Sequence, residues 1–208
     1  MKRVALILIA VLFSAAAQAA PIVVHNTGVD AADAVVAPGH PTAFWTLTTQ
    51  PAASGLTLGS TPFRFRAGPY YADTATSAWV APSASGIAGA IGHYIYTLPI
   101  DLTGLDAASA VITGEFGTDN QGSVSLNDGA PVAVAGLGDF GSPIPFTIGS
   151  GFVDGINFIH VDFNNAGDPS AFHVRFISAT AVPEPTTLAL LGAGVAGLAR
   201  IGRRRIRS

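Results

Sequence analysis

A few side chains of this 208-residue chain have the types and spacing that metal chemistry requires. His160 and Asp162 are two positions apart in an alternating segment, so they share one strand face and could hold a metal with His173 from a neighbouring strand. Residues 118–122 (Thr-Asp-Asn-Gln-Gly) offer oxygen ligands of the kind that Ca²⁺ prefers. A polar strand face and a plain turn are the simpler interpretations, so we predict neither a metal nor a cofactor.

Aromatic side chains suggest a second kind of site, because a flat ring can stack on a sugar. Tyr70 and Tyr71 are the best candidates for glycan contacts, since Gly68 and Pro69 place them in or next to a turn, where binding residues tend to lie. The other large candidates are expected mainly in the core (Trp45, Trp79, Tyr94, Tyr96).

Catalytic motifs are missing from the sequence. There is no G-x-S-x-G, no H-E-x-x-H and no Walker loop, and the single glutamate of the central region, Glu115, lies on an expected strand. We therefore expect no catalytic residue and a protein that is not an enzyme. A glycosidase needs only a suitably spaced carboxylate pair, so a secreted carbohydrate-active enzyme is the alternative.

The elements that would position these residues are short strands. Apolar and polar residues alternate in many segments, turn residues separate the segments, and no amphipathic helix is evident. This pattern predicts an all-β fold, a single antiparallel β-sandwich or jelly roll over residues 20–181. The expected strands are 22–25, 44–49, 63–66, 93–98, 110–116, 124–126, 131–135, 144–148, 156–164 and 171–180, with a hairpin turn at 127–129.

Composition and charge exclude several classes of protein. The chain has no Cys, so disulfides, thiolate metal sites and cysteine nucleophiles are excluded. Only 11% of its residues are charged, and residues 20–181 hold three Arg, no Lys, eleven Asp and one Glu. A region without a basic surface is a poor binder of phosphate backbones, so we expect no nucleic-acid partner.

The N-terminus has the three parts of a secretory signal peptide. Lys2 and Arg3 precede an apolar run at 4–13, and Ala17-Gln18-Ala19 follows as a cleavage site of the A-x-A type. We predict a signal peptide at 1–19 and export of the remainder.

The C-terminus has the parts of a short membrane anchor. Residues 187–199 form an apolar run about 20 Å long as a helix, short for a hydrocarbon core of about 30 Å. Basic residues stay on the cytoplasmic side of a membrane, so the cluster after the run predicts a transmembrane helix with its C-terminus inside. The topology signal comprises Arg200, Arg203, Arg204, Arg205 and Arg207.

Pro183, Glu184 and Pro185 stand immediately before this run. A Pro-Glu-Pro element, a short apolar helix and an arginine cluster, in this order, make residues 182–208 similar to the PEP-CTERM sorting signal of Gram-negative exopolysaccharide-producing bacteria. The resemblance implies that an exosortase, a membrane-embedded cysteine protease, recognises Pro183, Glu184 and Pro185. It also implies transient anchoring in the inner membrane, then removal of the helix and passage to the cell surface or matrix.

The central region resembles the galactose-binding-like jelly rolls that PEP-CTERM proteins often carry. The resemblance spans about residues 77–177 and rests on short motifs in order: 79–82 (Trp-Val-Ala-Pro), 94–96 (Tyr-Ile-Tyr), 101–104 (Asp-Leu-Thr-Gly), 118–120 (Thr-Asp-Asn), 126–127 (Leu-Asn) and 155–157 (Gly-Ile-Asn). We therefore expect an exported, non-enzymatic surface or matrix protein that binds extracellular polysaccharide. A permanently membrane-anchored adhesin is a further alternative, which differs only in keeping its tail.

Overall fold

The computed structural model describes residues 18–184 and residue 194, and Ala19–Glu184 form one compact unit. Within this unit all regular elements are strands, apart from the short 3-10 helices η1 (Ala107–Ser109) and η2 (Asp139–Gly141). The all-β prediction is confirmed. The strands are β1 (Ala20–Pro21), β2 (Thr46–Thr49), β3 (Phe63–Arg64), β4 (Val80–Ala81), β5 (Gly92–Asp101), β6 (Val111–Asp119), β7 (Gln121–Leu126), β8 (Ala133–Ala135), β9 (Ile144–Ile148), β10 (Ile156–Asn165) and β11 (Ala171–Ala181).

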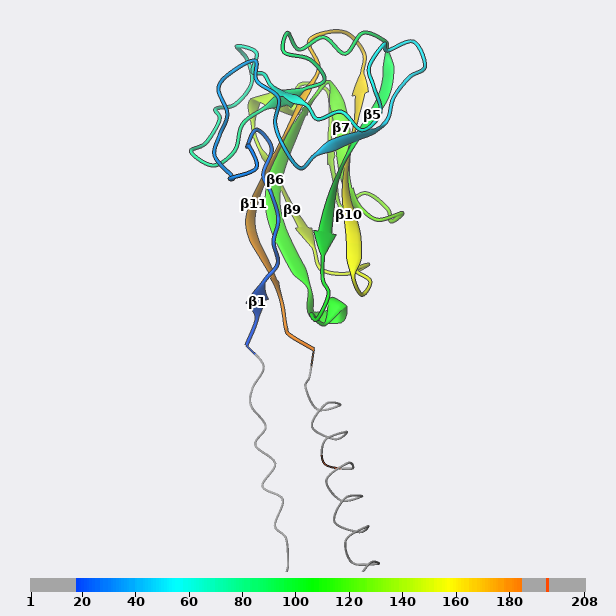
Figure 1. The fold of residues 1–208 in the computed structure, drawn as a ribbon. Helices are drawn as coiled ribbons and strands as arrows, with labels where there is room; N and C mark the ends of the chain where they lie inside the picture. The colour runs from blue at the N-terminus through cyan, green and yellow to red at the C-terminus, as the bar shows by residue number, and fades with distance from the viewer. Residues whose placement is uncertain (1–17, 185–193, 195–208) are drawn as a thin grey trace, which may run out of the picture. The chain divides into compact units, whose positions relative to one another are not determined.

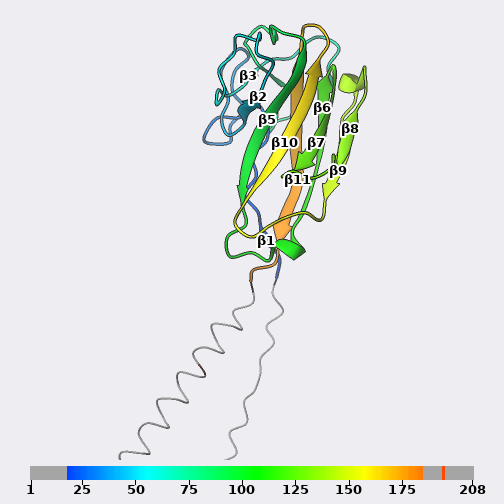
Figure 2. The same ribbon diagram turned by 90° about the vertical axis from the view of Figure 1, so that its right-hand side faces the viewer.

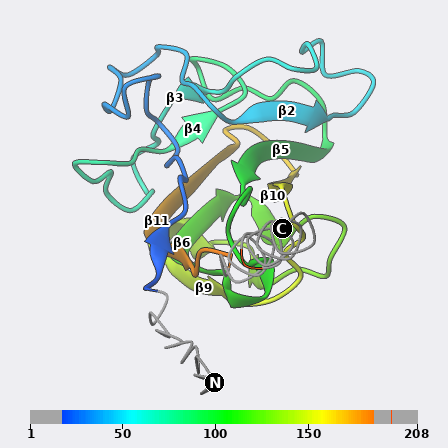
Figure 3. The ribbon, with the colours of Figure 1, turned by 60° about the horizontal axis from the view of Figure 1, so that its bottom comes forward.

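The strands form two antiparallel sheets (Figures 1 and 2). A six-stranded sheet has the order β3-β4-β11-β6-β9, with β1 also paired to β11, and a five-stranded sheet has the order β2-β5-β10-β7-β8. Figure 3 shows β2, β5 and β10 on one side and β11, β6 and β9 on the other. This arrangement is compatible with a jelly roll.

One apolar core lies between the sheets. Alternate residues of every long strand point into it, because successive side chains of a strand face opposite ways. Phe172 of β11 joins the layers: its ring lies 4.9 Å from that of Tyr96 on β5 and 5.9 Å from that of Phe163 on β10. Trp45, Tyr94 and Tyr96 are fully buried, as expected for core aromatics.

Alternation predicted the long strands well, and the differences lie in short or irregular segments. Residues 22–25 are not a strand, although Ile22 and Thr27 still donate hydrogen bonds to carbonyls of β11. The register of β11 shifts between Phe176 and Ser178, which interrupts the ladder there. Strand β4 has two residues and was not predicted, because so short a segment shows no alternation.

The predicted turn at 127–129 connects β7 to β8, which pair as a hairpin. Asn127 adopts a positive φ of 50°, a conformation that Asn tolerates better than most residues, and Gly129 donates its N–H to the carbonyl of Leu126 at 3.0 Å.

The two ends of the sandwich differ (Figure 1). At one end β1 pairs with the last residues of β11, so that Ala20 is opposite Ala181, and the turn containing η1 lies at this end too. The long connections between residues 25 and 90 gather at the other end. No helix of the described residues is long and apolar enough to cross a membrane. The predicted signal peptide up to residue 17 and the apolar run 187–199, except residue 194, lie outside the described residues.

Candidate functional site

The outer face of the five-stranded sheet is polar and open. His160 and Asp162 of β10 share this face, as their spacing predicted. The antiparallel register places Thr97 of β5 and Ser125 of β7 on either side of His160. It likewise places Ser123 of β7 beside Asp162, so polar rows run across the strands.

Hydrogen bonds fix two of these side chains. Nδ1 of His160 lies 2.8 Å from Oγ1 of Thr97, which in turn lies 2.8 Å from Oγ1 of Thr48 on β2. Nδ1 of His93 on β5 lies 2.9 Å from Oδ1 of Asp162. These bonds use Nδ1 of each imidazole and Oδ1 of Asp162. Nε2 of both histidines and Oδ2 of Asp162 can therefore bind a ligand.

Two adjacent hollows lie along this face, with volumes of about 270 and 390 Å³. They share Ser123, Pro131 and Asp162, and together we call them the outer-face groove. The smaller hollow adds His93, Gln121 and Asn164, and the larger adds Thr48, Ser125, Asp128 and His160.

The groove contains acids and histidines but neither Lys nor Arg. The three arginines of the described domain serve elsewhere: Arg64 pairs with Asp73, Arg175 pairs with Glu115, and Arg66 donates to the carbonyl of Tyr70. Burial lowers the pKa of His160, against a smaller opposing effect of Asp128. The groove is therefore neutral to acidic at pH 7.

Phe158 is a surface residue of this face that the sequence reasoning missed. It precedes His160 by two positions on β10, is 44% exposed, and its ring stacks toward that of His160 at a centroid distance of 6.4 Å. The alternation of β10 contained the signal, because an aromatic between the inward residues Asn157 and Ile159 must point outward. Phe158 places an exposed ring beside the groove.

The metal site that the spacing of His160, Asp162 and His173 would allow is not assembled. His173 lies on β11 in the six-stranded sheet, whereas His160 and Asp162 lie on β10 in the five-stranded sheet. The expectation that His173 occupies a neighbouring strand was wrong, because two strands that follow one another in sequence enter opposite layers. Among the described residues no group of three His, Cys, Asp or Glu could hold a metal ion.

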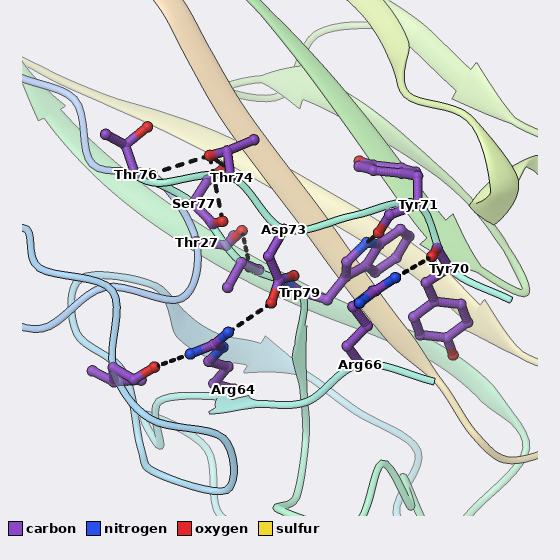
Figure 4. A network of polar contacts seen from close by, with 12 residues as sticks. Thr27, Arg64, Arg66, Tyr70, Tyr71, Asp73, Thr74, Thr76, Ser77 and Trp79 are labelled. Carbon is purple, nitrogen blue, oxygen red and sulfur yellow. Dashed lines mark hydrogen bonds and ion pairs between the residues drawn. The ribbon is translucent and has the colours of Figure 1, made fainter. Parts of the chain in front are cut away.

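Tyr70 and Tyr71 lie in an aromatic cluster on the outer face of the six-stranded sheet (Figure 4). Tyr70 is 2% exposed, and its ring lies 4.5 Å from that of Trp79 and 5.6 Å from that of Phe140. Tyr71 is half-buried, 4.8 Å from Trp79. Both rings are packed rather than open, so a sugar would reach Tyr70 only after this cluster separated. Their role as glycan contacts remains a prediction.

The close packing of this cluster depends on Gly117 of β6. A Cβ at this position would lie 2.7 Å from Cε1 of Tyr71 and 2.9 Å from Cη2 of Trp79, closer than such atoms approach. The absence of a side chain lets both rings lie on the sheet. The segment 64–79 thus covers this face.

Polar contacts hold the covering segment in place (Figure 4). Asp73 accepts a hydrogen bond from the Trp79 backbone N–H at 3.0 Å and one from the Arg64 guanidinium at 2.9 Å. The indole N–H of Trp79 donates to the carbonyl of Tyr71 at 2.9 Å. Each of these polar groups has its hydrogen-bond partner within the protein, which indicates a structural role.

His173 is a fully buried histidine beneath this segment. Its Nδ1 lies 2.8 Å from the hydroxyl of Tyr71, and its Nε2 has no hydrogen-bond partner among the described residues. Burial lowers the pKa of His173 to about 4, with Asp73 raising it and Arg175 lowering it to smaller extents. The imidazole is therefore neutral at pH 7.

Residues 118–122, whose oxygens could suit Ca²⁺, form the corner at which the chain passes from β6 to β7. Asp119 is 6% exposed and accepts a hydrogen bond from the Tyr70 hydroxyl at 2.7 Å, while burial raises the pKa of its carboxyl. Oδ1 of Asn120 accepts the N–H of Ala166 at 2.7 Å. Both oxygens are engaged within the protein.

Pro183 and Glu184 follow β11 and are exposed. Their backbone lies against the turn at 104–109, where Pro183 forms an isolated antiparallel bridge with Leu105. Pro185 and the arginines of the topology signal lie outside the described residues.

Comparison with known proteins identifies this end of the chain. Residues 181–205 match the PEP-CTERM protein-sorting motif. No curated protein and no solved structure matches the chain. The motif supports a secreted protein that an exosortase sorts through its C-terminal signal, in agreement with a destination at the cell surface or outside the cell.

Proposed function

We propose that the chain is a non-enzymatic surface or matrix protein whose sandwich binds a neutral extracellular polysaccharide in the outer-face groove. Exosortase removes its tail after export and transient anchoring in the inner membrane. We further propose that the sandwich is a jelly roll of the galactose-binding-like kind, because its strand order is compatible with that fold and the short motifs occur in the order described above.

The observation that carries the proposal is the lining of the groove. Hydroxyl, amide, imidazole and carboxylate groups are contributed by four strands, β2, β5, β7 and β10, and sugar hydroxyls can hydrogen-bond to each of them. Phe158 adds an exposed ring beside the polar rows, as a face for CH contacts.

The charge of the groove selects the class of polymer. A polysaccharide of uronic acids would place its carboxylates near Asp128 and Asp162, with no Lys or Arg in the groove to pair with them. Carboxylates brought close to one another repel. A neutral polymer avoids this repulsion.

Calorimetric titration of residues 20–184 with neutral dextran or galactan and with anionic alginate tests the proposal. We expect binding to a neutral polymer and none to alginate. Asp162→Ala should weaken binding about tenfold through lost hydrogen bonds, whereas the matched control Asp154→Ala, an exposed Asp outside the groove, should not.

Equal binding by both variants would place the ligand elsewhere. Release of reducing ends from the same polymers would instead identify the carbohydrate-active enzyme. Mass spectrometry of protein released from the native host separates the remaining alternative, because an anchored adhesin would still end at Ser208.

A further inference from the structure

The start of the sorting motif forms a small added strand on the folded domain. The N–H of Asp106 donates to the carbonyl of Val182 at 2.7 Å, and the N–H of Glu184 donates to the carbonyl of Gly104 at 3.0 Å. Between these two bonds Leu105 and Pro183 face one another in an antiparallel bridge. The side chain of Ser109 adds a third contact, because its Oγ accepts the N–H of Val182 at 2.7 Å.

Proline suits this register. The two backbone bonds of the bridge come from the residues beside Leu105 and Pro183, so the N–H that proline lacks is not required. Both N–H groups that residues 182–184 do possess are bonded to the turn. The sequence of the motif therefore fits docking on this turn.

Contacts within the domain hold the turn at 104–109 in place. Leu102 and Ala107 anchor it in the core. Asp106 caps η1 by accepting the N–H of Ala108 at 3.0 Å, and Ser109 donates its hydroxyl to the carbonyl of Asp106 at 2.7 Å. The surface that meets the tail is thus held independently of the tail.

We infer that the turn at 104–109 is a docking surface that restrains processing of the sorting motif. This inference rests on the proposed sorting by exosortase. A protease that binds its substrate as an added strand uses the hydrogen-bonding groups of an extended backbone, and docking already engages both N–H groups of residues 182–184 and the carbonyl of Val182. Only Pro185 and Thr186 separate Glu184 from the predicted apolar run, so the enzyme can engage the motif only after the docked strand is released.

A pair of substitutions at one position isolates the docking bond. Asp106 has a φ of −71°, which proline adopts without strain. Asp106→Ala and Asp106→Pro both lose the carboxylate that caps η1, but only Asp106→Pro loses the N–H that binds the tail. In a pulse-chase in the native host, we expect the full-length Asp106→Pro precursor to mature about fivefold faster than Asp106→Ala, the effect of one hydrogen bond.

Ser109→Ala tests the same surface from its other side. It should also speed maturation, whereas the matched control Thr103→Ala, which loses only a hydrogen bond to Asp101 just before the turn, should not. Hydrogen exchange on the purified full-length precursor supplies a second readout. The amides of Val182 and Glu184 should exchange faster in Ser109→Ala and Asp106→Pro than in their controls.

Maturation of Asp106→Pro at or below the rate of Asp106→Ala would overturn the restraint. Equal exchange in variants and controls would overturn the docking itself. A wild-type precursor that is never cleaved refutes the proposed sorting, and the restraint with it, while protected amides at Val182 and Glu184 would still identify the docked strand.

Discussion

Polar side chains are covered on the outer face of one sheet and exposed to solvent on the outer face of the other. On the six-stranded sheet, residues 64–79 cover His173 and Asp119, which bond to Tyr71 and Tyr70 of the covering segment. On the five-stranded sheet, His160 and Asp162 bond to neighbours on the same face and remain partly exposed. The same residue types thus stabilise the fold on one face and remain available to a ligand on the other.

These two roles differ because water reaches the polar groups of one face and not those of the other. A buried polar group must find a partner within the protein, and a missing partner costs about 1–3 kcal/mol. A partly exposed group can exchange water for a ligand at little cost to the fold. Substitutions on the covered face should therefore reduce stability, and those in the groove should reduce binding.

The largest difference should come from removing one aromatic ring on each face. Trp79→Ala deletes a fully buried ring that contacts Tyr70, Tyr71 and His173, and should lower the free energy of unfolding by about 3–5 kcal/mol. Phe158→Ala, the matched change on the open face, should cost less than about 1 kcal/mol, because that ring is 44% exposed. Urea denaturation measures both, and equal losses would contradict the comparison.

The next effect is a dependence of stability on pH. The folded-state pKa of His173 is about 4 and its ordinary value is 6.5, so between these values the unfolded state binds the proton more readily. The stabilisation is complete above pH 6.5 and is lost as the pH falls toward 4, by about 3 kcal/mol in total.

His173→Gln removes this titration and should reduce the slope of the stability curve between pH 6.5 and 4, leaving the contribution of His160, whose pKa burial also lowers. His93→Gln is the matched control on the open face, where the side chain is 65% exposed, and it should leave the contribution of His173 to the slope in place. Denaturation midpoints at several pH values measure the slopes. Identical slopes for wild type and His173→Gln would show that this histidine is not the source.

The smallest effect should come from deleting single hydroxyls. Tyr70→Phe leaves the buried carboxylate of Asp119 without its donor and should cost about 1–3 kcal/mol. Thr48→Ala removes an exposed hydroxyl bonded to Thr97 and should change stability by less than about 0.5 kcal/mol. Thermal unfolding measures the pair, and a larger loss for Thr48→Ala would reverse the assignment of the faces.

The alternation of apolar and polar residues predicted which side chains of a strand point inward, but not which strands lie next to one another in a sheet. Ile159, Val161 and Phe163 point inward, and His160 and Asp162 outward, because the period of a strand is fixed by its backbone. The sequence does not specify which strands lie side by side. For this reason His173 was expected near His160, and the groove, built from β2, β5, β7 and β10, was not anticipated.

Tyr70 and Tyr71 show a second limit. Their position after Gly68-Pro69 did indicate a connection between strands rather than a strand. A connection that folds back over a sheet is nevertheless buried, and this depends on the distant Gly117 making room for the rings. Such a contact between distant segments has no local signal.

The pairing of Ala20 with Ala181 has a consequence for how this domain could be reused. Paired strands lie about 5 Å apart, so the chain enters and leaves the sandwich through almost the same point. A unit with this geometry can be grafted into a surface loop of another protein without stretching the host, while its long connections point away from the junction. The domain is therefore suited to insertion into other proteins as a single unit.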